Sequence, residues 1–245
     1  MKRRRLLAGL GGCSIPVLLY ANRPPRQAIE VRYWLSTHAA AYDVYERIEE
    51  YLEAALDPVY DEVDLSFGGA VPVENEHGHG VTMSGEWPRL LLAGYGGAGD
   101  VEPAADVNLL VTDGPMRAAP TGVAISNIAS VGGGRYLERI PPRDDVDVEP
   151  YETSLRVMQV VIHEVGHVLG LKHEHGSITE VEDGTVASPM VSSYAWMSET
   201  PHFDDRRSAC GERYPRERDG ARYLSFDFSD CAQTVLRKYR GRLRP

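Results

Sequence analysis

Five residues within 163–173 have the types and spacing of a metal site with a neighbouring base: His163, Glu164, His167, Gly170 and His173. Histidines four positions apart on a helix lie about 40° apart around its axis and within about one turn, so both imidazoles can reach one ion. The glutamate points about 100° away from the first histidine, outside the coordination shell but near a water bound to the ion. Gly170 can take the positive φ of a sharp turn, after which His173 is available as third ligand. Three imidazoles with an open position suit catalytic Zn²⁺, so the sequence predicts one zinc site with Glu164 as general base.

The complete pattern H-E-x-x-H-x-x-G-x-x-H resembles the signature of the metzincin clan of zinc metallopeptidases. A second segment, Ser188-Pro189-Met190-Val191-Ser192-Ser193-Tyr194, resembles the Met-turn of that clan. This resemblance implies that Met190 forms the apolar floor beneath the three imidazoles. Relatives with a tyrosine near the zinc place it two positions after the methionine, where this chain has Ser192. Tyr194 is therefore expected either as a donor on the oxyanion side or as a packing residue, and the subfamily, matrixin-like or astacin-like, is not assigned.

The resemblance implies an endopeptidase that hydrolyses polypeptide substrates with a metal-activated water and proton transfer by Glu164. Residues 122–131 are expected to form the strand that lines the cleft, where an extended substrate can add by main-chain hydrogen bonds. An ordinary sheet strand without substrate contact is the alternative. A different class of function is a non-catalytic, zinc-stabilised binding or adhesion module on the cell surface. Glu164 argues against that class, because a purely structural zinc site needs four protein ligands and no adjacent base.

The spacing of apolar residues predicts the elements that must position this site. Strands are expected over 28–35, 63–67, 107–112 and 122–131, and helices over 42–56, from about 153 through the histidines, and over 228–239. The expected N-caps of the three helices are Ser36 or Thr37, Thr153 or Ser154, and Ser229 or Asp230. The middle helix is apolar nearly all round, which indicates that it is buried.

These elements, with the resemblance, imply an α+β, zincin-like fold: a twisted mixed sheet, two long helices above the cleft, and a smaller, irregular C-terminal subdomain with one helix. The expected organisation is an export signal and linker over 1–27 and a catalytic domain over 28–245, divided into an upper subdomain (28–173) and a lower one (174–245). Residues 68–99 have no clear periodicity, and His77 and His79 there are interpreted as solvated loop residues rather than ligands of a second zinc. His175 is interpreted as a solvated loop residue, with replacement of His173 as ligand as the alternative, and no motif supports a calcium site.

The chain has 245 residues with 42% hydrophobic residues, 24 Gly and 16 Pro, which indicates a globular, loop-rich domain. Its formal net charge of −10 argues against a nucleic-acid partner, because no basic stripe is present to displace counterions from phosphate. The acidity suits a protein that works in concentrated salt, with ordinary solubility as the alternative. We expect a monomer.

The amino terminus predicts export. Lys2-Arg3-Arg4-Arg5 followed by the apolar run from Leu6 resembles a twin-arginine signal, and Leu10-Gly11-Gly12-Cys13 resembles a lipobox. The alternatives are lipidation at Cys13, cleavage near Ala21, or an uncleaved anchor, and each implies an extracellular or cell-surface location. Outside the reducing cytoplasm, Cys210 and Cys231 are expected to form a disulfide, with two unpaired thiols as the alternative.

Overall fold

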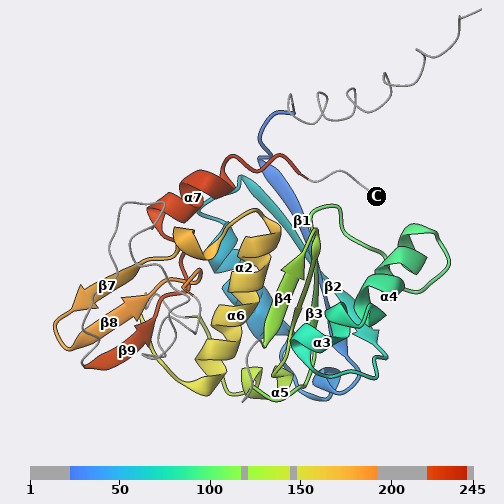
Figure 1. The fold of residues 1–245 in the computed structure, drawn as a ribbon, viewed down its shortest axis with the longest axis horizontal. Helices are drawn as coiled ribbons and strands as arrows, with labels where there is room; N and C mark the ends of the chain where they lie inside the picture. The colour runs from blue at the N-terminus through green and yellow to red at the C-terminus, as the bar shows by residue number, and fades with distance from the viewer. Residues whose placement is uncertain (1–22, 117–120, 144–147, 192–219, 242–245) are drawn as a thin grey trace, which may run out of the picture.

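The computed structural model describes residues 23–116, 121–143, 148–191 and 220–241. The signal segment, Cys13, Tyr194 and Cys210 lie outside these ranges, so lipidation, the role of the tyrosine and the disulfide stay predictions. The described chain combines helices with mixed sheets, which confirms the α+β class (Figure 1). No helix within the described ranges has the length and apolar character needed to cross a membrane.

The larger sheet has five strands in the order β2-β1-β3-β5-β4. They are β1 (Ala28–Ser36), β2 (Glu62–Val71), β3 (Val107–Val111), β4 (Gly122–Ile125) and β5 (Ile128–Val131). The first three and β5 are mutually parallel, whereas β4 runs antiparallel to β5 and lies at the edge. The predicted mixed sheet is therefore present, and its antiparallel edge strand begins at Gly122.

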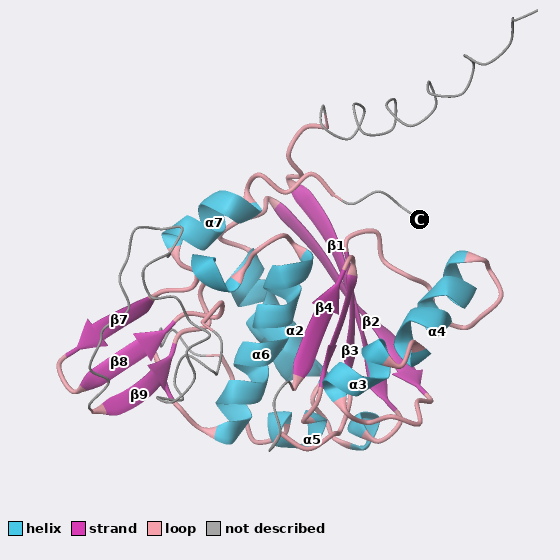
Figure 2. Ribbon diagram, in the orientation of Figure 1, coloured by secondary structure: helices cyan, strands magenta, loops and turns pink. Residues whose placement is uncertain are grey.

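Helices pack on both faces of this sheet (Figure 2). One face is covered by α2 (Tyr45–Leu56) and α6 (Thr153–Val168), the two long helices that the sequence predicts. Alternate residues of β1, among them Val31 and Tyr33, point into the core beneath them. The other face is covered by α3 (Gly78–Met83) and α4 (Glu86–Tyr95), which enclose a smaller core around Trp34 and Trp87.

The second half of the chain forms a second sheet beside α6, to the left in Figure 1. Its strands are β6 (Glu149–Pro150), β7 (Ile178–Val181), β8 (Gly184–Ala187) and β9 (Ala221–Leu224), in the order β6-β9-β8-β7. The short elements are η1 (Ala39–Ala41), α5 (Gly134–Leu137) and η2 (His173–His175), and α7 (Asp230–Leu236) follows the second sheet. The lower subdomain was expected to be irregular, but in its described part β7, β8 and β9 form a regular sheet, which β6 of the preceding segment completes.

One predicted helix start and one predicted N-cap differ from the structure. The first long helix begins at Tyr45 rather than near residue 42, because Ser36 is used earlier: its Oγ accepts the Ala39 N–H at 3.0 Å and opens η1 instead. The helix that carries His163 and His167, α6, begins at Thr153 as predicted, but its N-cap is Glu152 rather than Thr153 or Ser154, and no side chain caps it. The predicted N-cap of the last helix is confirmed, since the Ser229 Oγ accepts the Ala232 N–H at 3.3 Å, but the helix ends at Leu236 rather than near residue 239.

Two further predictions were wrong. Residues 122–131 form a hairpin of β4 and β5, not one strand, with a turn in which Ser126 has a φ of 57°. The interpretation of His77 and His79 as solvated loop residues was wrong, because His79 lies within α3 and His77 is its N-cap, with its Nδ1 accepting the Gly80 N–H at 3.3 Å. Residues 68–99, to which the sequence assigned no element, contain both α3 and α4.

Candidate metal centre

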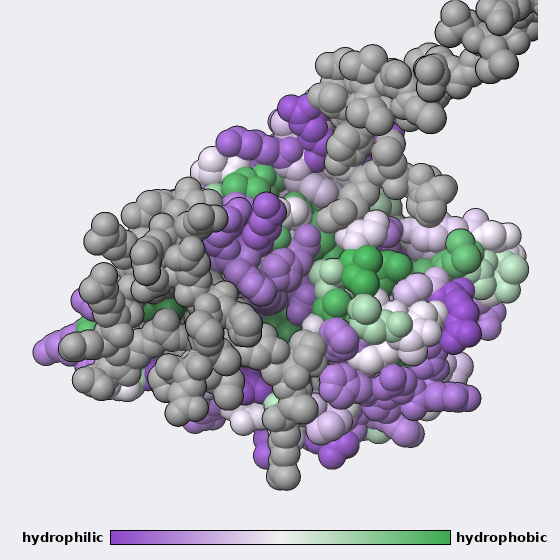
Figure 3. Space-filling view, viewed as in Figure 1, coloured by the Kyte–Doolittle hydropathy of each residue, from purple (hydrophilic) through white to green (hydrophobic). Residues whose placement is uncertain are grey.

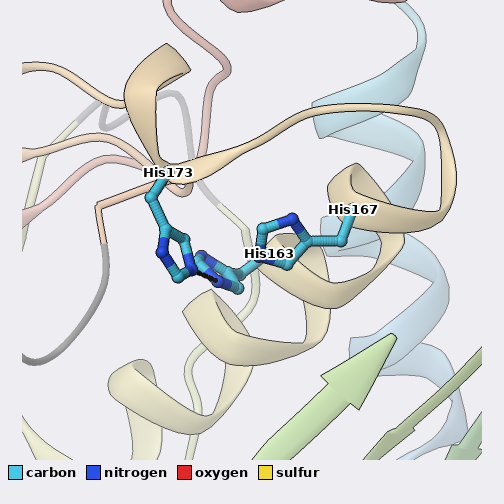
Figure 4. A group of neighbouring side chains, drawn as sticks. All are labelled: His163, His167 and His173. Carbon is cyan, nitrogen blue, oxygen red and sulfur yellow. Dashed lines mark hydrogen bonds between the residues drawn. The ribbon is translucent and has the colours of Figure 1, made fainter. Parts of the chain in front are cut away.

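The buried helix α6 places two of the predicted ligands on one face. His163 and His167 have ring centroids 4.5 Å apart with perpendicular planes, and the centroid of His173 lies 5.0 and 4.8 Å from theirs. One nitrogen from each ring can be chosen so that the three atoms lie within 4.8 Å of one another (Figure 4). This is the one group of three or more potential metal-ligating side chains among the described residues.

The third histidine reaches the first two because the chain reverses after α6. Gly170 has a φ of 100°, a backbone conformation that favours glycine. The Leu171 N–H then donates to the Gly166 carbonyl at 2.9 Å, which closes the turn. The chain passes back into η2, where His173 faces the helix and its Nε2 lies 3.2 Å from that of His163.

Backbone carbonyls orient two of the rings. The Nδ1 of His163 lies 2.8 Å from the Pro189 oxygen, and the Nδ1 of His167 lies 2.9 Å from the Leu171 oxygen. A carbonyl only accepts, so each Nδ1 carries the proton and each Nε2 offers a lone pair. This arrangement, in which a ligand histidine donates its other N–H to a carbonyl, is typical of metal sites.

The surroundings keep the three imidazoles neutral. Burial, with the neighbouring rings as a smaller cause, lowers the pKa of His163 well below its ordinary value of 6.5. Burial also lowers the pKa of His167, and it lowers that of His173 to about 4. Neutral imidazole is the form that binds metal, so at neutral pH these residues fit a divalent cation that prefers nitrogen ligands, such as Zn²⁺.

Glu164 lies beside this group and is only 6% exposed. Burial raises the pKa of its carboxyl from 4.5 to about 8. The carboxyl faces the edge strand: a side chain at Gly122 would place its Cβ 2.7 Å from Oε1 and 2.9 Å from Cγ of Glu164. Because Gly122 has no side chain, it leaves the space that the Glu164 carboxyl occupies.

The segment 188–191 packs against α6 between the two helical ligands. Met190 is 1% exposed, and its Sδ lies 2.6 Å from the position that a Cβ would take at Gly166, the residue directly before His167. Glycine at that position is what allows the sulfur to approach the helix. The structure thus places Met190 against the helix that bears two of the histidines, and the preceding Pro189 orients one ring.

Sequence reasoning missed several residues that position the site. No side chain in the sequence indicates that the Pro189 and Leu171 carbonyls accept hydrogen bonds from the histidine rings. The same holds for the close contact between Gly122 and Glu164. The solvated interpretation of His175 was wrong, because this residue is 8% exposed and its Nδ1 accepts the Lys172 N–H at 2.9 Å. That bond closes the η2 turn that presents His173, and the short spacing Lys172-x-x-His175 was the signal available.

A scan against protein-family models finds no family that matches this chain, and a search of curated proteins finds no similar protein. The case for a function therefore depends on the residues and their geometry.

Proposed function

We propose that this chain is a zinc-dependent endopeptidase of the metzincin type with a zincin-like fold. The observation that carries the proposal is the convergence of His163, His167 and His173 within 4.8 Å, with the buried carboxyl of Glu164 directly beside them on α6. The carbonyl partners of two of the rings add support, because they leave Nε2 free to coordinate.

Three protein ligands favour a catalytic over a structural zinc site, because structural sites are closed by four. Among the described residues no fourth histidine, cysteine or carboxylate joins the group. A non-catalytic adhesion module would gain nothing from burying an acid at this position, where desolvation raises the pKa of Glu164.

The chemistry divides between the ion and the chain. Bound zinc supplies a Lewis acid and an acidified water. With the cation bound, its positive charge would favour the ionised form of Glu164, which could then take a proton from the attacking water as the bond between the water oxygen and the peptide carbon forms. The same carboxyl gives the proton to the amide nitrogen as the carbon–nitrogen bond breaks, which releases an amine and a carboxylic acid.

The edge strand supports a polypeptide substrate. Gly122, the first residue of β4, lies beside Glu164, and a chain paired along the outer edge of β4 would pass the carboxyl. The amino-terminal pattern supports action outside the cytoplasm, either secreted or anchored at the cell surface. We propose no nucleic-acid partner, given the net charge of −10.

Cleavage of casein by the purified mature protein tests this function. We expect cleavage to stop on addition of a chelator and to return with stoichiometric zinc. Zinc binding without cleavage of casein or of any unfolded polypeptide would favour the adhesion module instead.

A further inference from the structure

The residues of β4 face two different sides of the molecule. Gly122 faces Glu164 and Val160 of α6, and Ala124 packs into the core on the same side. Because side chains alternate along a strand, Val123 and Ile125 face the opposite side, toward α3 and α4.

Cross-strand pairing supports this assignment. Val123 pairs with Ser130, whose Oγ lies 2.6 Å from the Thr82 Oγ1 of α3. Ile125 pairs with Ile128, and Ile128 packs against the smaller core beneath α3 and α4. The side chain of Ile125 therefore lies on the α4 side of the edge strand.

Apolar side chains gather at this end of β4. Ile125 is 48% exposed, and on α4 Leu92 is 65% exposed and Tyr95 37% exposed, one helical turn apart. The two elements are joined there, because the Asn127 Nδ2 donates to the Tyr95 hydroxyl at 2.7 Å. We call Ile125 and Tyr95 the Ile125 surface, and Figure 3 shows apolar residues between the end of β4 and α4.

The Ile125 surface continues the proposed cleft. One edge of β4 is bonded to β5, and no strand of the described chain pairs with the other. A peptide added to that edge beside Glu164 and Gly122 would reach Ile125 after three residues, about 10 Å along the strand. Its side chains would alternate, so those turned away from α6 would meet Ile125.

We propose that the Ile125 surface is a specificity site for an apolar side chain of the substrate, three or four residues from the cleaved bond. This inference rests on the proposed peptidase function and adds a substrate preference to it. Water leaves both apolar surfaces when they meet, which favours substrates with a large aliphatic or aromatic residue there.

Profiling cleavage sites in a diverse peptide library by mass spectrometry tests the inference with the zinc-loaded protein. We expect wild-type cleavage sites to be enriched in Leu, Ile, Phe or Met at one position three or four residues from the scissile bond. Ile125→Lys should lose that enrichment, gain a preference for Asp or Glu at the same position, and cut an apolar-matched peptide about tenfold less efficiently. Ile125→Thr, a smaller change in shape, should weaken the preference for apolar residues without creating a preference for Asp or Glu.

The matched control is Val181→Lys, since Val181 is an aliphatic residue, 41% exposed, at the end of the edge strand β7 of the other sheet. This variant should keep the wild-type profile. If Ile125→Lys retains zinc and cuts with the wild-type profile, the specificity site is refuted while the peptidase function stands. If the zinc-loaded wild type cuts no peptide, the proposed function fails and the inference fails with it.

Discussion

The close approach of Met190 to Gly166 predicts how an added methyl group at residue 166 will behave. In Gly166→Ala the new Cβ would lie 2.6 Å from the Met190 Sδ, 3.1 Å from Phe228 Cε1 and 3.2 Å from Leu171 Cδ1. Such overpacking costs about 1–3 kcal/mol. Alanine also gains about 1 kcal/mol over glycine inside a helix. The net expectation is a loss of up to about 2 kcal/mol in the free energy of unfolding.

Truncating the methionine separates these two effects. In a Met190→Ala background the closest contact of the new methyl group is gone, so Gly166→Ala should then gain about 1 kcal/mol from helix propensity. The coupling energy between the two substitutions should therefore be about 1–3 kcal/mol in favour of the double variant.

Urea unfolding of the wild type, both single variants and the double variant measures this coupling, with a chelator present so that metal binding does not contribute. Substitutions that do not interact add to within about 0.5 kcal/mol. A coupling energy below that value would mean that Met190 does not pack against α6 at Gly166, and the Met-turn assignment would be lost with it.

Two further predictions concern the histidines. His175→Ala should raise the zinc dissociation constant about tenfold while zinc stoichiometry stays at one, because the Lys172 N–H loses the acceptor that closes the η2 turn presenting His173. Competition with a chromogenic chelator measures the dissociation constant, and an unchanged affinity would remove the positioning role of His175. In metal-free Glu164→Gln, which lacks the titrating carboxyl, stability should fall as pH drops from about 7 toward 5. The sign follows because unfolded histidines take up protons near 6.5 whereas the folded pKa of His173 is about 4, so protons bind the unfolded state first. Adding His173→Asn should make the slope shallower by up to about 1.4 kcal/mol per pH unit, and an equal slope in both proteins would contradict the burial of this ring.

The site was predictable because its side chains fall in one stretch whose geometry a helix and a glycine turn determine. Helical spacing placed His163 and His167 on one face, and the positive φ at Gly170 brings His173 to them. The atoms that orient these rings are backbone carbonyls, and the identity of the residue that carries a carbonyl is not constrained by that role. The sequence therefore contained the ligands but not their partners.

The elements that were missed are short or interrupted. The hairpin β4–β5 was read as one strand because its turn contains Ser126 rather than a glycine, although that residue takes a φ of 57°. The second sheet has strands of two to four residues, and three of the four residues of β7 are exposed, so no alternation could develop. Both features depend on tertiary packing, which local patterns do not record.

The most direct test of the central claim is peptide hydrolysis by the zinc-loaded wild type and by Glu164→Gln, with zinc content measured in the same samples. The buried carboxyl lies next to the ligands without being one of them, so both proteins should hold one zinc per chain. Loss of the general base should lower kcat by at least about 100-fold, since proton transfer by a positioned side chain contributes about 10²–10⁴. Turnover near the wild-type rate in zinc-loaded Glu164→Gln would contradict the assigned role of Glu164. No hydrolysis by the zinc-loaded wild type would contradict the peptidase itself.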